Sequence, residues 1–248
     1  MSIADLGTIC FAVQILFGAT LVIGERTGLA RLPYGKFRTR GGINSRAGLA
    51  LAYAIPVFVY VVVWIEGRGT LDTPYRSIVY GAFLLHFTRR ILEICFVNTY
   101  SRPTALRALV AIAVLYSGAA ASCAFFQVRT LEPPSKLLLV IGGITFIFGE
   151  LLNAYHHWLL ARVCVSRSSS YSVPRGGLFR WVASPHYVGE IFSFLGYAML
   201  SDLLPVWGTA LAASAYLSAR ANSTLEWYRR EMPLRIPPGW RRLVPFIY

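Results

Sequence analysis

Long runs of apolar residues, separated by short polar stretches, dominate the pattern along this chain. A helix that crosses the hydrocarbon layer of a membrane needs about 20 consecutive, mostly apolar residues. Seven stretches reach this length, although some are interrupted by charged positions. The pattern therefore predicts seven membrane-spanning helices, over about 4–24, 47–65, 77–97, 105–126, 136–160, 187–204 and 206–226.

The composition agrees with this interpretation. Charged residues make up only 14% of the chain and hydrophobic residues 56%, whereas a soluble domain has roughly 25% charged residues. We therefore expect an all-α integral membrane protein with a single membrane domain over residues 1–248, in contact with membrane lipids. The net charge of +13 does not indicate a nucleic-acid partner, because such modules cluster their charge on a soluble face.

The basic residues follow the loops of one membrane side. Seventeen Lys and Arg residues lie in or beside the loops after the first, third and fifth predicted helices and in the C-terminal tail. The opposite loops hold only Arg68, Arg76, Arg129 and Lys136. Because cytoplasmic loops carry an excess of Lys and Arg, the asymmetry predicts a non-cytosolic N-terminus and a cytosolic C-terminus.

Four ionisable residues interrupt the third predicted helix. His86, Arg89, Arg90 and Glu93 stand at i, i+3, i+4 and i+7, so they share one helical stripe. Exposing such a stripe to lipid is costly, and it must face a cavity or partner charges. An ion pair between Glu93 and either arginine is the simplest structural interpretation, and it is compatible with a functional role.

A second polar cluster ends the fifth predicted helix. Glu150, Asn153 and His157 lie on one face, either as polar residues at the membrane interface or as a wall for a cofactor. The adjacent His156 and His157 cannot point the same way, and no H-x-x-x-H spacing occurs, so we expect no catalytic metal.

The last predicted helix carries Arg220. A planar guanidinium grips an oxyanion through two hydrogen bonds, so Arg220 is a candidate phosphate ligand. An internal salt bridge to Glu226 is possible, although a separation of six residues is poor spacing for it.

The segment 174–190 holds paired glycines, two arginines, a His-Tyr pair and a carboxylate between two hydrophobic stretches. Gly176 and Gly177 allow backbone N–H groups to approach a phosphate closely, and Arg175 adds charge. Tyr187 and Glu190 are three residues apart and share a face if the helix has begun. A helix start at the membrane interface is the alternative interpretation.

These motifs together resemble the steroid 5α-reductase family. The resemblance rests on Asn153-x-x-x-His157, the run 171–179, Ser184-Pro-His-Tyr187 with Glu190, Arg220, and Trp227-Tyr228. It implies a seven-helix bundle of the endoplasmic reticulum membrane, with residues 137–248 forming an NADPH-binding catalytic region. It places Asn153, Tyr171, Glu190, Arg220 and Tyr228 at cofactor-binding positions; the other cofactor candidates are His157, Arg175, Gly176 and His186.

The chain departs from the steroid branch at the two positions that hold the substrate there, and also at His157, Cys164 and His186. Steroid reductases hold the 3-keto oxygen with a Glu before a proline of the second helix and a Tyr after the histidine of the third, but here the matching residues are Ile55 and Phe87. The run 86–93 is instead similar to very-long-chain trans-2-enoyl-CoA reductases. In that branch a catalytic Lys is matched by Arg89, and a catalytic Tyr by Tyr187.

The hypothesis is an oxidoreductase that uses NADPH to reduce a C=C bond conjugated to a carbonyl in a lipid, of the 3-oxo-Δ4 steroid type. A very-long-chain enoyl-CoA substrate is the alternative. Tyr187 is the predicted donor to the carbonyl oxygen, with Arg89 and His86 as electrostatic support. A membrane methyltransferase and a seven-helix receptor or transporter are rival classes, although no internal repeat typical of a transporter is visible.

Overall fold

The computed structural model describes residues 1–29, 31–33, 37, 41–100, 103–130, 132–165 and 172–245, without the side chains of 164 and 165. Within these ranges the chain forms seven α-helices and two short helical turns. They are α1 (Ile3–Thr27), α2 (Ser45–Glu66), α3 (Pro74–Leu92), the π-helical turn η2 (Glu93–Val97), α4 (Leu106–Thr130), α5 (Lys136–Val165), the 3-10 turn η3 (Gly177–Arg180), α6 (Pro185–Ser201) and α7 (Leu204–Glu231).

Local signals explain where several of these helices begin. The Asp5 N–H donates to the Ser2 hydroxyl while the Asp5 side chain accepts from the Ser2 N–H, which forms a capping box at the start of α1. The Asn44 side chain caps α2. Thr73 caps α3, and Pro74 follows at the first helical position, where its missing N–H costs nothing.

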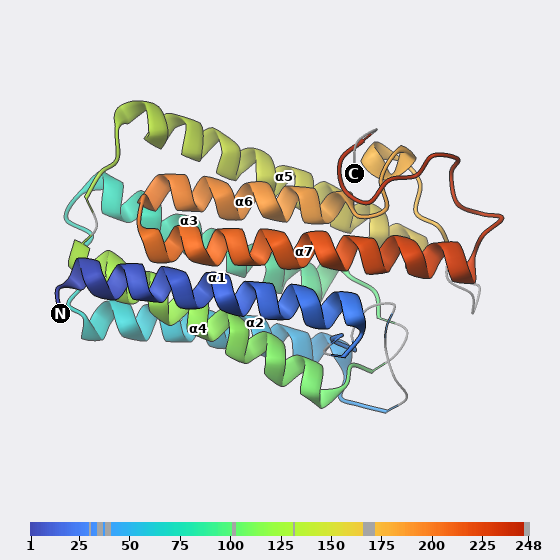
Figure 1. The fold of residues 1–248 in the computed structure, drawn as a ribbon, viewed down its shortest axis with the longest axis horizontal. Helices are drawn as coiled ribbons and strands as arrows, with labels where there is room; N and C mark the ends of the chain where they lie inside the picture. The colour runs from blue at the N-terminus through green and yellow to red at the C-terminus, as the bar shows by residue number, and fades with distance from the viewer. Residues whose placement is uncertain are drawn as a thin grey trace.

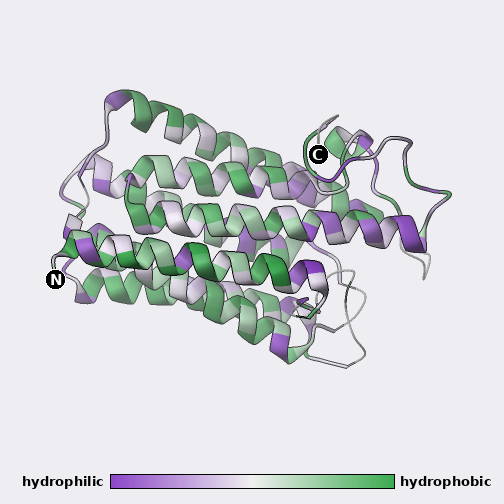
Figure 2. Ribbon diagram, viewed as in Figure 1, coloured by the Kyte–Doolittle hydropathy of each residue, from purple (hydrophilic) through white to green (hydrophobic). Residues whose placement is uncertain are grey.

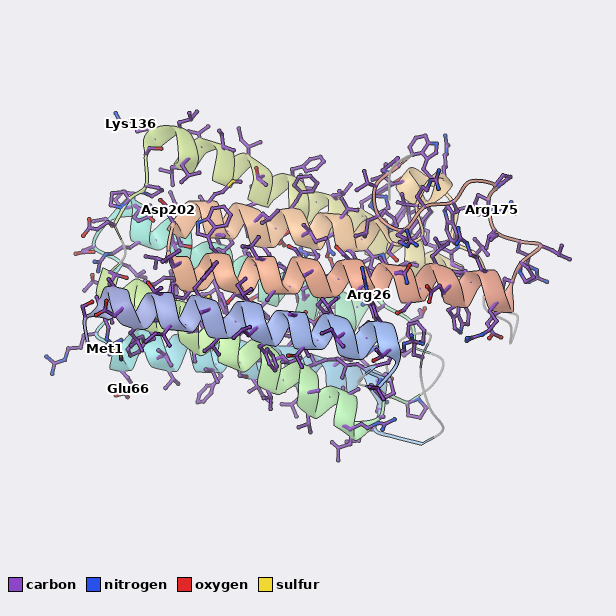
Figure 3. All side chains as sticks on the ribbon, viewed as in Figure 1. Met1, Arg26, Glu66, Lys136, Arg175 and Asp202 are labelled. Carbon is purple, nitrogen blue, oxygen red and sulfur yellow. The ribbon has the colours of Figure 1, made fainter. Side chains whose placement is uncertain are left out.

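The helices lie nearly side by side and run alternately in opposite directions (Figure 1). The most extensive pairs are α5 with α6, α1 with α7, and α2 with α4, while α6 and α7 join two of these pairs. The loops and the tail that hold most of the basic residues therefore meet at one end of the bundle. Glu66, Lys136 and Asp202 lie at the other end, near Met1 (Figure 3).

Four helices, α1, α2, α4 and α5, are long and apolar enough to cross a membrane. The remaining predicted spans also form helices, but α3 and α7 contain buried charged residues and α6 has only 17 residues. The exact ends differ from the prediction, because α7 continues to Glu231 and the third helix changes to a π-helical turn at Glu93. Hydrophobic residues predominate along most of the helices (Figure 2), and many large apolar side chains are exposed.

Glycines allow α5 and α6 to pack closely. A methyl group added at Gly189 of α6 would lie 2.4 Å from the Asn153 backbone nitrogen of α5, and one at Gly149 would lie 2.3 Å from the Ser193 nitrogen. Small residues at such contacts let helix backbones approach within a membrane. The close approach brings the polar residues of the two helices into one site.

Candidate functional site

A cavity of about 700 Å³ runs through the bundle. Each of the seven α-helices contributes to its wall, which is mostly apolar, with aromatic rings such as those of Phe83, Phe87 and Phe194. The charged side chains on the wall come from the parts of α3, α6 and α7 nearer the basic loops. The ionisable side chains on its wall include His86, Arg90, His157, His186, Tyr187, Glu190 and Arg220.

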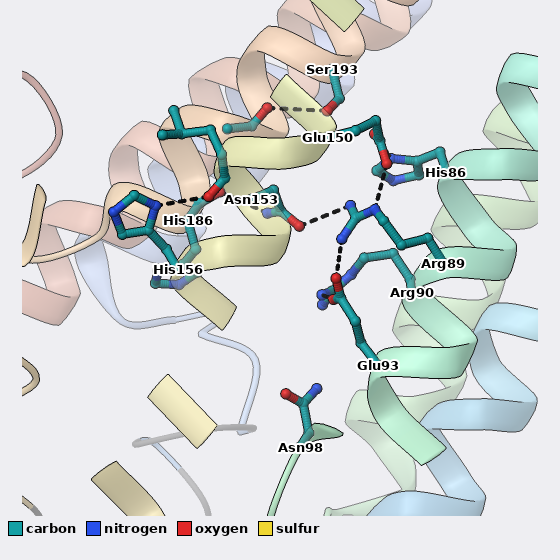
Figure 4. Close-up of polar contacts among 12 residues, drawn as sticks. His86, Arg89, Arg90, Glu93, Asn98, Glu150, Asn153, His156, His186 and Ser193 are labelled. Carbon is teal, nitrogen blue, oxygen red and sulfur yellow. Dashed lines mark hydrogen bonds and ion pairs between the residues drawn. The ribbon is translucent and has the colours of Figure 1, made fainter. Parts of the chain in front are cut away.

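A buried polar network joins α3 to α5 (Figure 4). His86 Nδ1 lies 2.7 Å from Glu150 Oε1, and Arg89 Nε donates to Glu150 Oε2 at 2.5 Å. Arg89 also donates to Asn153 Oδ1 at 2.9 Å and forms an ion pair with Glu93. The carboxylates thereby neutralise the charges that the third helix places inside the bundle.

This network separates the two arginines of α3. Arg89 makes its contacts with α5 and Glu93, and it is not among the residues that line the cavity. Arg90 lines the cavity, pairs with Glu93 and lies over the Tyr53 ring at 5.6 Å from the centroid. Both ion pairs considered from the sequence are therefore present. The Arg89 guanidinium joins α3 to α5. A catalytic role for Arg89 stays a prediction.

Asn153 links this network to the start of α6. Its Nδ2 donates to the His186 backbone carbonyl at 2.7 Å. The His186 ring then lies beside the Tyr187 ring at 4.2 Å and the His157 ring at 5.1 Å between centroids. Tyr187 and Glu190 line the same cavity, as expected from their spacing on one helical face.

Glu190 also contacts α4. The Tyr116 hydroxyl donates to Glu190 Oε1 at 3.3 Å, and the Tyr116 ring packs against the rings of Tyr53 and Phe87. Sequence reasoning missed Tyr116, because no charged residue stands near it in α4 and no recognised motif includes it.

His156 fixes the segment before α6. The Leu178 N–H donates to His156 Nε2 at 3.1 Å, so the His156 Nδ1–H donates to the Leu152 carbonyl at 2.7 Å. Gly177 has a φ of 49°, and a methyl group there would lie 2.8 Å from His156 Nε2. His156 was not among the predicted site residues, and only the three-dimensional contact reveals its role.

Arg220 is paired with the first helix. Its Nη1 lies 3.2 and 2.9 Å from the two oxygens of Glu25, and its Nη2 donates to the Leu32 carbonyl at 3.0 Å. The salt bridge to Glu226 considered from the sequence does not form, because Glu226 is exposed and accepts from Asn222 at 2.6 Å. The distance of 195 residues between Arg220 and Glu25 hid this pair from sequence analysis.

The remaining predicted residues lie away from the cavity wall. Tyr228 is buried against Trp240 in a small core beneath the C-terminal segment. Arg175 lines a separate shallow pocket with Ser172 and Arg235, and Gly176 precedes η3. Asn153 acts from behind the wall, as described for the network. Tyr171 lies outside the described residues, and no group of metal-ligating side chains converges among the described ones.

The fold and site define a membrane-embedded helical bundle with a largely apolar cavity and a polar end. A family model described as 3-oxo-5-alpha-steroid 4-dehydrogenase matches residues 104–248. The chain belongs to this family, the steroid 5α-reductases, as its motifs indicated.

Three relatives illustrate its range of similarity. A very-long-chain enoyl-CoA reductase of Dictyostelium discoideum is 29% identical over 79% of this chain and 67% of its own length. A 3-oxo-5-alpha-steroid 4-dehydrogenase 1 of Bos taurus is 24% identical over 98% and 93%. Steroid 5-alpha-reductase DET2 of Solanum lycopersicum is 28% identical over 87% and 88%. Together with the family match, they support assigning the chain to the membrane oxidoreductases.

Proposed function

We propose that this protein is an NADPH-dependent reductase of a C=C bond conjugated to a carbonyl group in a lipid. The observation that carries the proposal is the single cavity lined by all seven helices, in which His86, Tyr187, Glu190 and Arg220 are brought together with apolar walls. An apolar pocket with a few convergent polar groups is the usual form of a small-molecule site. Ionisable groups at membrane depth are typical of function.

The residues at the polar end fit a dinucleotide. Arg220 supplies a guanidinium and Glu190 a carboxylate at the cavity wall. Asn153, behind the wall, holds the start of α6 in place, and Gly176 and Gly177 give the preceding segment the positive φ values that glycine allows. His157, His186, Tyr171, Arg175 and Tyr228 complete the predicted cofactor-binding set. When bound, NADPH supplies a hydride, which forms a C–H bond at the β-carbon of the substrate.

The chain then has to stabilise the charge that this addition creates. As the electron pair of the C=C bond moves, negative charge develops on the carbonyl oxygen, and a donor placed beforehand lowers the barrier. Tyr187 is the proposed donor. His86, held at the wall by Glu150, and Arg89, which donates to the same carboxylate, are the proposed electrostatic support. Arg90 adds a further guanidinium on the wall. Water or Tyr187 then delivers a proton to the α-carbon, which completes the reduction.

A 3-oxo-Δ4 steroid is the proposed substrate class, because the cavity walls are apolar and aromatic and the chain matches steroid reductases over nearly its whole length. A very-long-chain trans-2-enoyl-CoA is the second candidate. It is favoured by the Dictyostelium discoideum relative and by Ile55 and Phe87, which replace the two polar groups that hold the steroid 3-keto oxygen.

The proposal includes the placement in the membrane. All seven α-helices would span the bilayer, and the polar residues of α3, α6 and α7 would face the cavity instead of lipid. The end that carries the basic loops would face the cytosol, where NADPH is found. The endoplasmic reticulum is the proposed membrane.

Purified protein in lipid nanodiscs tests the function directly. NADPH oxidation is measured with a 3-oxo-Δ4 steroid and, separately, with a long-chain trans-2-enoyl-CoA. Oxidation that depends on one of them supports the proposal and selects the substrate class. Thermal stabilisation by S-adenosylmethionine but not by NADPH, or oxidation with neither substrate, would overturn it.

A further inference from the structure

The two positions that supply polar donors in the steroid branch are apolar here, and they occupy different places. Ile55 of α2 is 38% exposed on the outer surface and is absent from the cavity wall. Phe87 of α3 is 5% exposed, and its ring forms part of that wall. The cavity wall therefore presents an aromatic face at position 87, where the steroid branch has a phenol.

A phenol stands directly beside that face. The Tyr116 ring of α4 meets the Phe87 ring edge to face, with 5.5 Å between centroids and 84° between planes. Both rings line the cavity. The Tyr53 ring of α2 also packs against the Tyr116 ring, with 5.2 Å between centroids.

The same phenol is joined to a carboxylate. The Tyr116 hydroxyl donates to Glu190 Oε1 at 3.3 Å, and Glu190 is 4% exposed. Arg90, also on the wall, interacts electrostatically with Glu190. At 3.3 Å the contact is longer than the 2.5–3.0 Å of an ordinary O–H···O bond, so the hydrogen bond to Glu190 is a weak one.

From this geometry we infer that Tyr116 is a further catalytic residue, whose hydroxyl turns from Glu190 to donate its hydrogen bond to the substrate carbonyl oxygen. The inference rests on the proposed reduction. The phenol comes from α4 here, instead of from α3 as in the steroid branch. Tyr116 and Tyr187 would then provide two donors for one developing oxyanion, since Tyr116 contacts Glu190, which lies one helical turn from Tyr187 on α6.

The hydrogen bond strengthens as charge moves onto the oxygen, so its loss should lower kcat more than it raises KM. Tyr116→Phe removes only the hydroxyl and keeps the ring packing. We expect kcat to fall about 100-fold, which is typical for one lost oxyanion donor, with NADPH binding retained. Tyr80→Phe is the matched control, because Tyr80 packs against Tyr60 and Trp64 away from the cavity wall.

A rescue variant separates catalysis from folding. Phe87→Tyr adds a hydroxyl to the ring that neighbours Tyr116. The double variant, Phe87→Tyr with Tyr116→Phe, should therefore have a kcat at least about 10-fold higher than Tyr116→Phe alone, because one oxyanion donor contributes about 10²-fold or more. A structural role for Tyr116 would give no such recovery.

A binding measurement adds a readout that needs no turnover. An ionised naphthol imitates the oxyanion, and Tyr116→Phe should weaken its binding about 10-fold, as for a lost hydrogen bond to a charged group. The inference alone would be overturned if the wild type turns over substrate and Tyr116→Phe does so equally well. It would also be overturned if Tyr116→Phe binds the naphthol as tightly as the wild type. Absence of turnover by the wild type with either substrate would overturn the proposed function together with it.

Discussion

Arg220 of α7 and Glu25 of α1 form an ion pair that is buried in the interior of the bundle. One guanidinium nitrogen contacts both carboxylate oxygens, and the two residues are 1% and 0% exposed. The guanidinium also lies over the Phe37 ring at 4.3 Å from its centroid. The pair holds Arg220 at the cavity wall. It also joins α1 to α7, and these two helices pack extensively against each other.

Replacing Glu25 with glutamine should destabilise the protein strongly. The change leaves the Arg220 charge buried without its partner, and breaking a buried pair costs about 3–5 kcal/mol. Equilibrium unfolding in mixed micelles measures the free energy of unfolding. Glu231→Gln is the control, because the Arg230–Glu231 pair is largely exposed and such pairs contribute at most about 1 kcal/mol. Equal effects of the two changes would contradict the prediction.

Gly189→Ala should separate α5 from α6. The added methyl group would lie 2.4 Å from the Asn153 nitrogen and 2.7 Å from its Cα, both of which are backbone atoms that cannot move aside. Helix separation would displace Asn153 from the His186 carbonyl. We expect a lower melting temperature and loss of the stabilisation that NADPH gives, both measured by thermal shift.

Gly81→Ala is the matched control for that substitution. Gly81 lies in α3, and a methyl group there meets nothing within 4 Å. Alanine is favoured over glycine in a helix by about 1 kcal/mol, so Gly81→Ala should leave the protein equally or more stable. A Gly189→Ala protein as stable as the Gly81→Ala protein would disprove the close packing of α5 and α6.

The helices and their polar stripes could be predicted from the sequence, because they depend on local pattern. Apolar runs of sufficient length indicated each helix, and the spacing of His86, Arg89, Arg90 and Glu93 placed them on one face. Both Glu93 ion pairs follow from that spacing alone, since i+3 and i+4 neighbours meet on a helix.

The partners across the bundle could not be predicted in this way. Glu25, Tyr116 and Glu150 each contact a residue on another helix, between 61 and 195 positions away. No periodicity in one helix reveals which face of another helix will lie against it. The sequence therefore indicated that charges had to be neutralised, but the fold was needed to show which residues neutralise them.

Glu150→Gln should weaken the network between α3 and α5. Glu150 accepts from Arg89 and pairs with His86, and it is 4% exposed. Its loss leaves Glu93 as the one carboxylate of the described residues paired with Arg89, beside the neutral Asn153, so we expect a loss of about 3 kcal/mol in the free energy of unfolding. Reduction should also slow, because His86 loses the group that orients its ring. Glu226→Gln, at the exposed side of α7, should change stability by no more than about 0.5 kcal/mol.

Tyr187→Phe tests the donor that the sequence motif predicted. Tyr187 lies at the start of α6 on the cavity wall, beside the His186 ring. Losing an oxyanion donor lowers kcat by about 10²- to 10³-fold, while NADPH should bind as before because the ring and the helix start remain. Initial rates give kcat, and thermal shift reports cofactor binding. Tyr155→Phe, an exposed phenol on α5 outside the cavity wall, should keep full activity. Near-normal turnover by Tyr187→Phe would remove Tyr187 from the proposed mechanism and leave Tyr116 as its phenolic donor.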